Sequence, residues 1–201
     1  MFFQNNCTKP VDKPNYPVKL YTFTGIIEQN LEYTLNLISM LEDPAVKYKN
    51  EDSSNKLTKL KTDIKFDITN YSLEKIIEII TFTTLLESVY NSTNEIKGYI
   101  KELIKYPPTG FDLSEIAIKI SGIAKKQIDG FFAVNIDTGL EPAIAETERL
   151  INTALRRLHK LNDNERLEKG RIVYYSCIIT VLKEILEKTS SLQLSHIPTS
   201  A

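Results

Sequence analysis

Residues 141–188 read EPAIAETERLINTALRRLHKLNDNERLEKGRIVYYSCIITVLKEILEK, and this stretch decides the fold. In its first half, the residues expected to face inward recur at intervals of three and four positions. This is the period of a helix that packs lengthwise against other helices. The residues of this stripe are Ile144, Thr147, Ile151, Ala154, Leu158 and Leu161. Leu150 and Leu155 widen the stripe beyond a coiled-coil seam, so the pattern predicts a bundle helix.

The second half of the stretch predicts the helix at the centre of the bundle. We expect it to run from about residue 165 to residue 188, with Asn162, Asp163 or Asn164 as its N-cap. Apolar side chains cover most of its circumference between Ile172 and Leu182, and such a helix is surrounded by other helices. The uncharged run covers only residues 172–182, whereas a membrane span needs about 20 residues. We therefore predict a central C-terminal helical hairpin and no membrane span.

The same period predicts further helices upstream. They cover residues 25–42 with Thr24 as a cap, residues 73–91 with Ser72 as a cap, residues 94–106, and a segment that begins at Asp112 or Ser114 and ends near residue 129. The polar run at 91–94, Asn-Ser-Thr-Asn, is expected to break or kink the chain, because these residue types favour turns.

Two segments are compatible with more than one structure. Residues 56–71 place apolar side chains at helical spacing, yet residues 60–68 also alternate apolar and charged side chains as a strand does. We favour a helix there, because an isolated strand leaves its backbone groups unpaired. Residues 131–136, FFAVNI, are compatible with three structures: a buried connector, an extra helical turn, or a strand that pairs with 56–71. The predicted fold is mainly all-α, a single multi-helix bundle with room for one short strand pair.

Three regions are expected along the chain. Residues 1–21 contain Pro10, Pro14 and Pro17 in a polar setting, which predicts an extended N-terminal arm. This arm is expected to lie across the body or to dock on a partner. Residues 22–189 form the helical bundle domain, and residues 190–201 are expected to be a flexible tail.

Amino-acid composition limits which binding partners and which cellular compartment are expected. The 201 residues carry a net charge of −1, so no global field favours nucleic acid or an acidic membrane. Two cysteines, Cys7 and Cys177, cannot form a disulfide framework. The first residues lack the charged start and apolar run of a signal peptide. We expect a soluble protein of the cytoplasm or another reducing intracellular compartment, with no nucleic acid as partner.

The motifs of common catalytic and metal sites are missing. The two histidines, His159 and His196, belong to no HExxH or Glu-x-x-His pair, and no Cys-x-x-Cys occurs. The glycines never fall at the spacings of a phosphate-binding loop or a dinucleotide fingerprint. We therefore expect neither a metal nor a cofactor, and the sequence favours a protein that is not an enzyme.

All five arginines lie between Arg149 and Arg171. Around the expected turn, six cationic and three acidic residues give a local charge of +3 in a chain of net charge −1. Arginine binds carboxylate or phosphate through two parallel hydrogen bonds, which lysine does less well. The predicted partner- or anion-binding residues are Arg156, Arg157, Lys160, Arg166 and Arg171. Arg149 is left out, because Glu146 three residues earlier favours a local ion pair. The alternative is that the cluster only offsets the helix dipole and pairs with neighbouring glutamates.

Three functions fit these observations. The first is a non-catalytic protein-binding or scaffold subunit that acts through helical surfaces and the arginine-bearing end of the hairpin. The second is a small regulator or effector that modulates an enzyme by surface contact. The third is an enzyme of unfamiliar type, which a deep pocket with converging Asp, Glu, Tyr or His side chains would favour.

Overall fold

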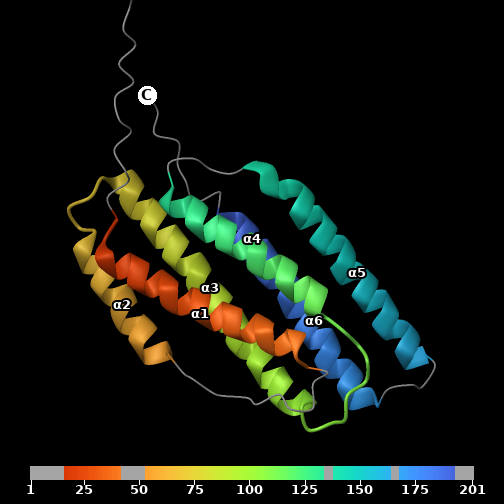
Figure 1. Cartoon of the computed structure of the whole chain (residues 1–201). Helices are drawn as coiled ribbons and strands as arrows, with labels where there is room; N and C mark the ends of the chain where they lie inside the picture. The colour runs from red at the N-terminus through yellow and green to blue at the C-terminus, as the bar shows by residue number, and fades with distance from the viewer. Residues whose placement is uncertain (1–15, 42–52, 134–137, 164–167, 193–201) are drawn as a thin grey trace, which may run out of the picture.

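The computed structural model describes residues 16–41, 53–133, 138–163 and 168–192. Within these residues the chain forms six α-helices, one short 3-10 helix and no strand (Figure 1). The helices are α1 (Val18–Ser39), α2 (Ser54–Asp67), α3 (Leu73–Leu103), α4 (Ser114–Phe132), α5 (Glu141–Asp163) and α6 (Lys169–Ser190), with η1 at Thr138–Leu140. The predicted all-α bundle is confirmed. Helix α2 covers residues 56–67 of the ambiguous segment at 56–71, and the described residues contain no strand pair.

The helices are arranged around α6. It packs against α3, α4 and α5, while α1 packs against α3 and α4 from the other side. In Figure 1, α5 lies along one edge of the bundle and α2 along the opposite edge. The central position predicted for α6 is therefore confirmed. Its hairpin partner α5 packs chiefly on α4 and α6 and is an outer helix.

The sequence of α6 explains its central position. Ile178, Ile179 and Val181 are buried, and they point to different sides of α6, because successive positions of an α-helix lie about 100° apart. Val173, near the start of α6, keeps 56% of its surface exposed. Thr180, Lys183 and Glu187 are exposed as well, so α6 keeps one solvent-facing stripe beside its buried sides.

The expected break at 91–94 is wrong, because α3 runs uninterrupted from Leu73 to Leu103. Its polar residues are used inside the bundle. Ser92 accepts a hydrogen bond from Lys188 Nζ at 2.7 Å, and the hydroxyl of buried Thr93 donates to the Tyr90 carbonyl oxygen at 2.7 Å. Asn30 of α1 donates to the same Thr93 hydroxyl. These tertiary hydrogen bonds outweigh the local preference of such residues for turns.

Several predicted helix boundaries need correction. Helix α1 begins at Val18, seven residues before the predicted start, because buried Leu20 and Phe23 extend its inner face toward the N-terminus. The extended arm can therefore include only residues before the helix, and residues 1–15 lie outside the described part. Thr24 is no cap, since it lies in the interior of α1 and donates to the Leu20 carbonyl.

Other corrections concern the connections. Phe131 and Phe132 form the last turn of α4, which matches the extra helical turn among the three alternatives. Asn162 and Asp163 still belong to α5, and the N-cap of α6 is Glu168, so the predicted N-cap at Asn162, Asp163 or Asn164 is wrong. Ser72 does cap α3, and its hydroxyl accepts from the Lys75 N–H at 3.3 Å.

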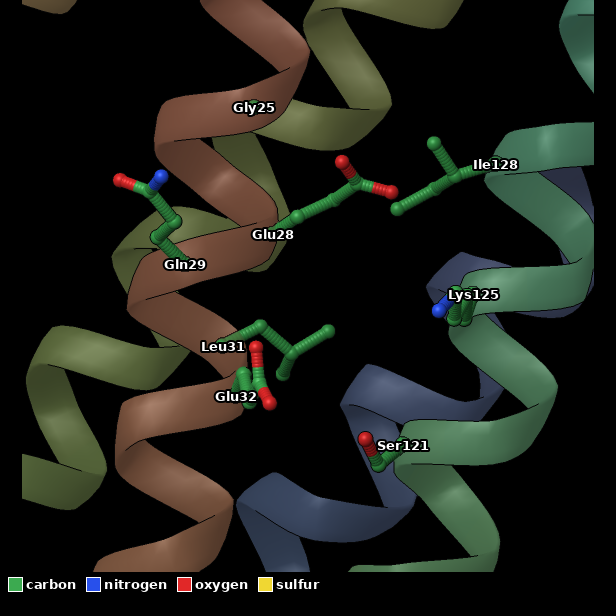
Figure 2. Close-up of a pocket in the computed structure, with 8 residues that line it drawn as sticks. All are labelled: Gly25, Glu28, Gln29, Leu31, Glu32, Ser121, Lys125 and Ile128. Atoms are coloured by element: carbon green, nitrogen blue, oxygen red, sulfur yellow. The ribbon is translucent and has the colours of Figure 1, made fainter.

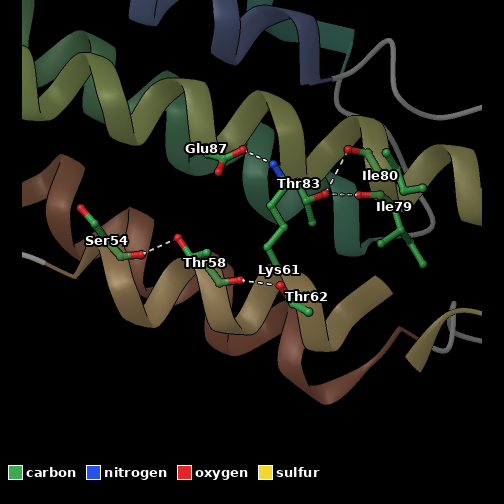
Figure 3. A network of polar contacts seen from close by, with 8 residues as sticks. All are labelled: Ser54, Thr58, Lys61, Thr62, Ile79, Ile80, Thr83 and Glu87. Carbon is green, nitrogen blue, oxygen red and sulfur yellow. Dashed lines mark hydrogen bonds and ion pairs between the residues drawn. The ribbon is translucent and has the colours of Figure 1, made fainter. Parts of the chain in front are cut away.

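Helix α2 is attached through a narrow contact. Within it only Leu57 and Ile64 are buried, and it packs chiefly on α1. Lys61 reaches across to α3 and forms an ion pair with Glu87 (Figure 3). The hydroxyls of Thr58 and Thr62 donate to carbonyl oxygens one turn earlier, so they are satisfied within their own helix. The small buried area makes α2 the least firmly packed of the described helices.

None of the described helices combines the length and the uninterrupted apolar character that a bilayer crossing requires.

Replacing Ile178 by Asp should unfold the domain, because an unpaired charge at a fully buried position costs several kcal/mol, out of a total stability of about 5–15 kcal/mol. Helicity by circular dichroism during a thermal scan measures the effect. The matched control is Val173→Asp on the exposed part of α6, which should leave the scan nearly unchanged. Equal thermal scans for both variants would mean that Ile178, and with it this side of α6, is not part of the core.

Candidate functional site

Three of the predicted site residues lie together on α5. Thr153, Arg156, Arg157 and Lys160 are spaced by three, one and three positions, which places them along one side of the helix. All four are exposed, whereas Thr147, Ile151 and Leu158 on the other side are buried. We call the surface formed by Thr153, Arg156, Arg157 and Lys160 the α5 edge. The period of α5 thus separates a packing stripe from a cationic stripe.

An apolar groove runs beside the α5 edge. Its volume is about 220 Å³, and it lies between α5 and the start of α4. The apolar lining residues are Phe111, Leu113, Ile116, Leu150 and Ala154. Polar residues at its rim are Asp112, Glu115, Thr153 and Arg157. The groove therefore combines an apolar floor with one cationic wall and one acidic wall.

The groove is built on the connection between α3 and α4. Gly110 has φ of +73°, a conformation that favours glycine, and it lets the chain turn before Phe111. The Phe111 ring meets the Tyr175 ring of α6 edge-on at 4.9 Å, and the Phe111 N–H donates to the Thr109 hydroxyl at 3.1 Å. The floor of the groove is thereby fastened to the central helix. Arg157 places its guanidinium carbon 5.7 Å from the centre of the Phe111 ring, a cation–π arrangement.

The charges of Arg156 and Arg157 are not neutralised by an acid within the described residues. Arg156 Nε donates to the Asn152 carbonyl oxygen at 3.3 Å, and Arg157 contacts the ring of Phe111. Further up α5, Glu146 pairs with Lys119 of α4 at 3.2 Å, so its expected pairing with Arg149 is not what the structure shows. Neighbouring glutamates therefore do not account for the two central arginines of the cluster.

Arg171 does not join the α5 edge. It is 8% exposed, and its Nη2 donates to the Pro107 carbonyl oxygen. Its guanidinium carbon lies 5.6 Å from the centre of the Tyr106 ring, and its Nε has no partner among the described residues. Arg171 is thus a buried residue that binds the connection between α3 and α4 through Pro107 and Tyr106. Arg166, also predicted for the site, lies outside the described residues.

A second groove, of about 270 Å³, lies between α1 and α4. Figure 2 shows the Glu28 side chain extending from α1 toward Ile128 of α4, with Lys125 on the same side of α4. Burial raises the pKa of the Glu28 carboxyl, Asp129 and Glu32 raise it further, and Lys125 opposes them. Sequence reasoning missed this acid, because its environment comes from a second helix far along the chain.

The polar side chains that line the α1–α4 groove bear on the enzyme alternative. Its described lining contains Glu28, Glu32 and Lys125 with a serine and a glutamine, but no histidine, tyrosine or cysteine. No group of three potential metal-ligating side chains occurs in the described part of the chain. Of the converging side chains that would favour an enzyme, the described lining of this groove supplies two glutamates, Glu28 and Glu32.

The pKa shift of Glu28 predicts a pH-dependent effect on stability. A carboxyl whose pKa is raised by folding lowers stability above its folded pKa, and this penalty disappears below its unfolded value. Glu28→Gln should therefore raise the thermal midpoint at pH 7, and the gain should vanish below the ordinary value of 4.5. Glu148→Gln, at an exposed position of α5, is the control. A gain that persists at pH 3.5 would contradict the assignment.

Removing the Arg171 guanidinium should destabilise the fold. Arg171→Met keeps most of the side-chain volume but leaves the Pro107 carbonyl without its donor, at a cost of about 1–3 kcal/mol. Arg156→Met, at an exposed position, should change stability by no more than about 0.5 kcal/mol. Urea unfolding measures both variants. Equal midpoints for Arg171→Met and the parent would mean that burying this charge costs as much as its hydrogen bond contributes.

We compared the chain with profiles of known protein families, with curated proteins and with solved structures, and none of them matches.

Proposed function

We propose that the protein is a non-catalytic protein-binding module, which docks a segment of a partner protein along the α5 edge. The observation that carries the proposal is the position of Arg156 and Arg157. Both are exposed and have no acidic partner in the described residues, and Arg157 lines the apolar groove. A cationic stripe beside an apolar groove matches a ligand that offers carboxylates and apolar side chains together.

The partner segment that fits best is an acidic amphipathic helix. Thr153, Arg156, Arg157 and Lys160 extend over two turns of α5, so they offer contacts along a line rather than around a point. A helix laid beside α5 would place apolar side chains, spaced by three or four residues, over Leu150 and Ala154. Its glutamates or aspartates would then face the two arginines.

Nucleic acid fits this surface less well. A nucleic-acid backbone carries negative charge along its whole length and would be repelled by Asp112 and Glu115 on the opposite wall of the groove, whereas an amphipathic helix can turn its acids toward the arginines alone. Three cations on one helix also form a small basic area compared with the broad patch of a nucleic-acid-binding face. A scaffold subunit and a regulator of an enzyme would use the same surface, and the bound partner distinguishes these two functions.

The proposal predicts binding of a defined peptide. The probe is a fluorescein-labelled acidic amphipathic helix with leucines at helical spacing, and a peptide of the same composition in scrambled order is the reference. Fluorescence polarisation should show at least about tenfold tighter binding of the amphipathic peptide, equal to ~1.4 kcal/mol. The binding should weaken as salt rises, because the contacts are exposed.

Two variants locate the binding. Arg156→Glu with Arg157→Glu should reduce the affinity at least tenfold, whereas Lys59→Glu with Lys65→Glu, an equal charge change on exposed positions of α2, should not. Arg156→Lys with Arg157→Lys keeps the charge but loses the two-pronged geometry, and it should weaken binding about fivefold, or ~1 kcal/mol. Absence of binding, or equal binding by the double glutamate variant, would refute the proposal.

A further inference from the structure

The start of α3 carries an apolar stripe that no described element covers. Leu73, Ile77 and Ile80 are spaced by four and three residues, so they lie on one side of the helix. Their exposed fractions are 72%, 46% and 41%. Isolated exposed apolar residues are ordinary, but three at helical spacing form a continuous surface. We call Leu73, Ile77 and Ile80 the α3 stripe.

The chain enters α1 at the level of the α3 stripe but on the opposite, inward side of α3, which carries Lys75 and Glu78. The Tyr16 hydroxyl donates to Glu78 Oε1 of α3 at 2.7 Å, and Lys75 Nζ lies 3.7 Å from the centre of the Tyr16 ring. Tyr16 also packs against the ring of Phe131 at 5.0 Å. Residue 16 is therefore fixed on the first two turns of α3, the turns that carry the α3 stripe. Tyr16 is thus the point to which the 15 preceding residues are tethered.

These 15 residues have the composition to cover an apolar stripe. They begin with Met1, Phe2 and Phe3, and polar residues and prolines make up most of positions 4–15. The 13 residue steps from Phe3 to Tyr16 can span up to about 45 Å, whereas seven helical steps from Leu73 to Ile80 cover only about 10 Å. Length therefore permits contact between the two phenylalanines and the whole α3 stripe.

We propose that Phe2 and Phe3 dock on the α3 stripe of their own chain. The fixed position of Tyr16 holds the segment near its binding surface, and a short tether gives an effective concentration of about millimolar. A weak apolar contact is then sufficient. Burial of the phenylalanines and of Leu73, Ile77 and Ile80 in the same contact removes apolar surface from water on both sides.

A second copy of the chain fits the α3 stripe less well. A stable interface buries about 800 Å² on each partner, and three partly exposed side chains cannot supply that area by themselves. The tethered segment needs no such area, because it does not lose the translational freedom of a second molecule.

Paramagnetic NMR of the full chain tests the contact. A nitroxide is attached to Cys7 in a Cys177→Ser background, and the isoleucine methyl signals are followed. The Ile77 and Ile80 methyl signals should lose at least half of their intensity. Ile118 on α4 is also exposed but lies 13 residues from Phe131, toward the other end of the helix, so its signal should be retained. Phe2→Ser with Phe3→Ser should restore the Ile77 and Ile80 signals without changing the rest of the spectrum.

Two outcomes would overturn the inference. Equal intensities for Ile77, Ile80 and Ile118 would mean that the segment does not visit the α3 stripe. In a mixed sample, the nitroxide is carried by one copy and the isotope label by another. Broadening that is as strong in this mixture as within one chain would make a second copy the occupant. Neither outcome bears on the α5 edge, since the peptide assay uses a different surface.

Discussion

The burial of the apolar sides of α6 against other helices is the constraint on which the rest of the structure depends. A helix with apolar side chains on several sides is stable in water only when other helices cover those sides. Helices α3, α4 and α5 do so, and α1 completes the layer on α3 and α4. Polar residues at the helix contacts are paired by hydrogen bonds between helices, since Lys188 of α6 donates to buried Ser92 of α3. The central helix thus determines where its neighbours lie.

Hydrophobic period could be read from the sequence, and tertiary context could not. The stripe of α5 and the central place of α6 follow from side-chain spacing, and both are confirmed. The polar run at 91–94 misled the prediction, because its hydrogen bonds come from Asn30 and Lys188, far away in the chain. Helix ends were misplaced for a related reason. Local capping preferences are weak, so packing of residues such as Leu20 and Phe23 decides where a helix starts.

In the candidate site, sequence likewise could not show which charged residues are buried and which are exposed. Sequence counting found the arginine cluster, but it could not separate Arg171, which is buried beneath the α3–α4 connection, from Arg156 and Arg157, which are exposed. The difference depends on Pro107 and Phe111, which belong to a connection more than 40 residues upstream. Glu28 was missed for the same reason, since the groove that raises its pKa exists only where α1 meets α4.

The packing of α5 connects the proposed binding surface to the stability of the bundle. Thr147, Ile151 and Leu158 are buried in α5, whereas α6 buries residues on several sides. Less buried apolar area means that α5 separates from the body at a lower free energy than α6 does. A partner that lies across both α5 and the Phe111 side of the groove holds the two together, because it binds only when α5 is in place. Binding at the α5 edge would then stabilise the outer helix most, and it would leave the core around α6 unchanged.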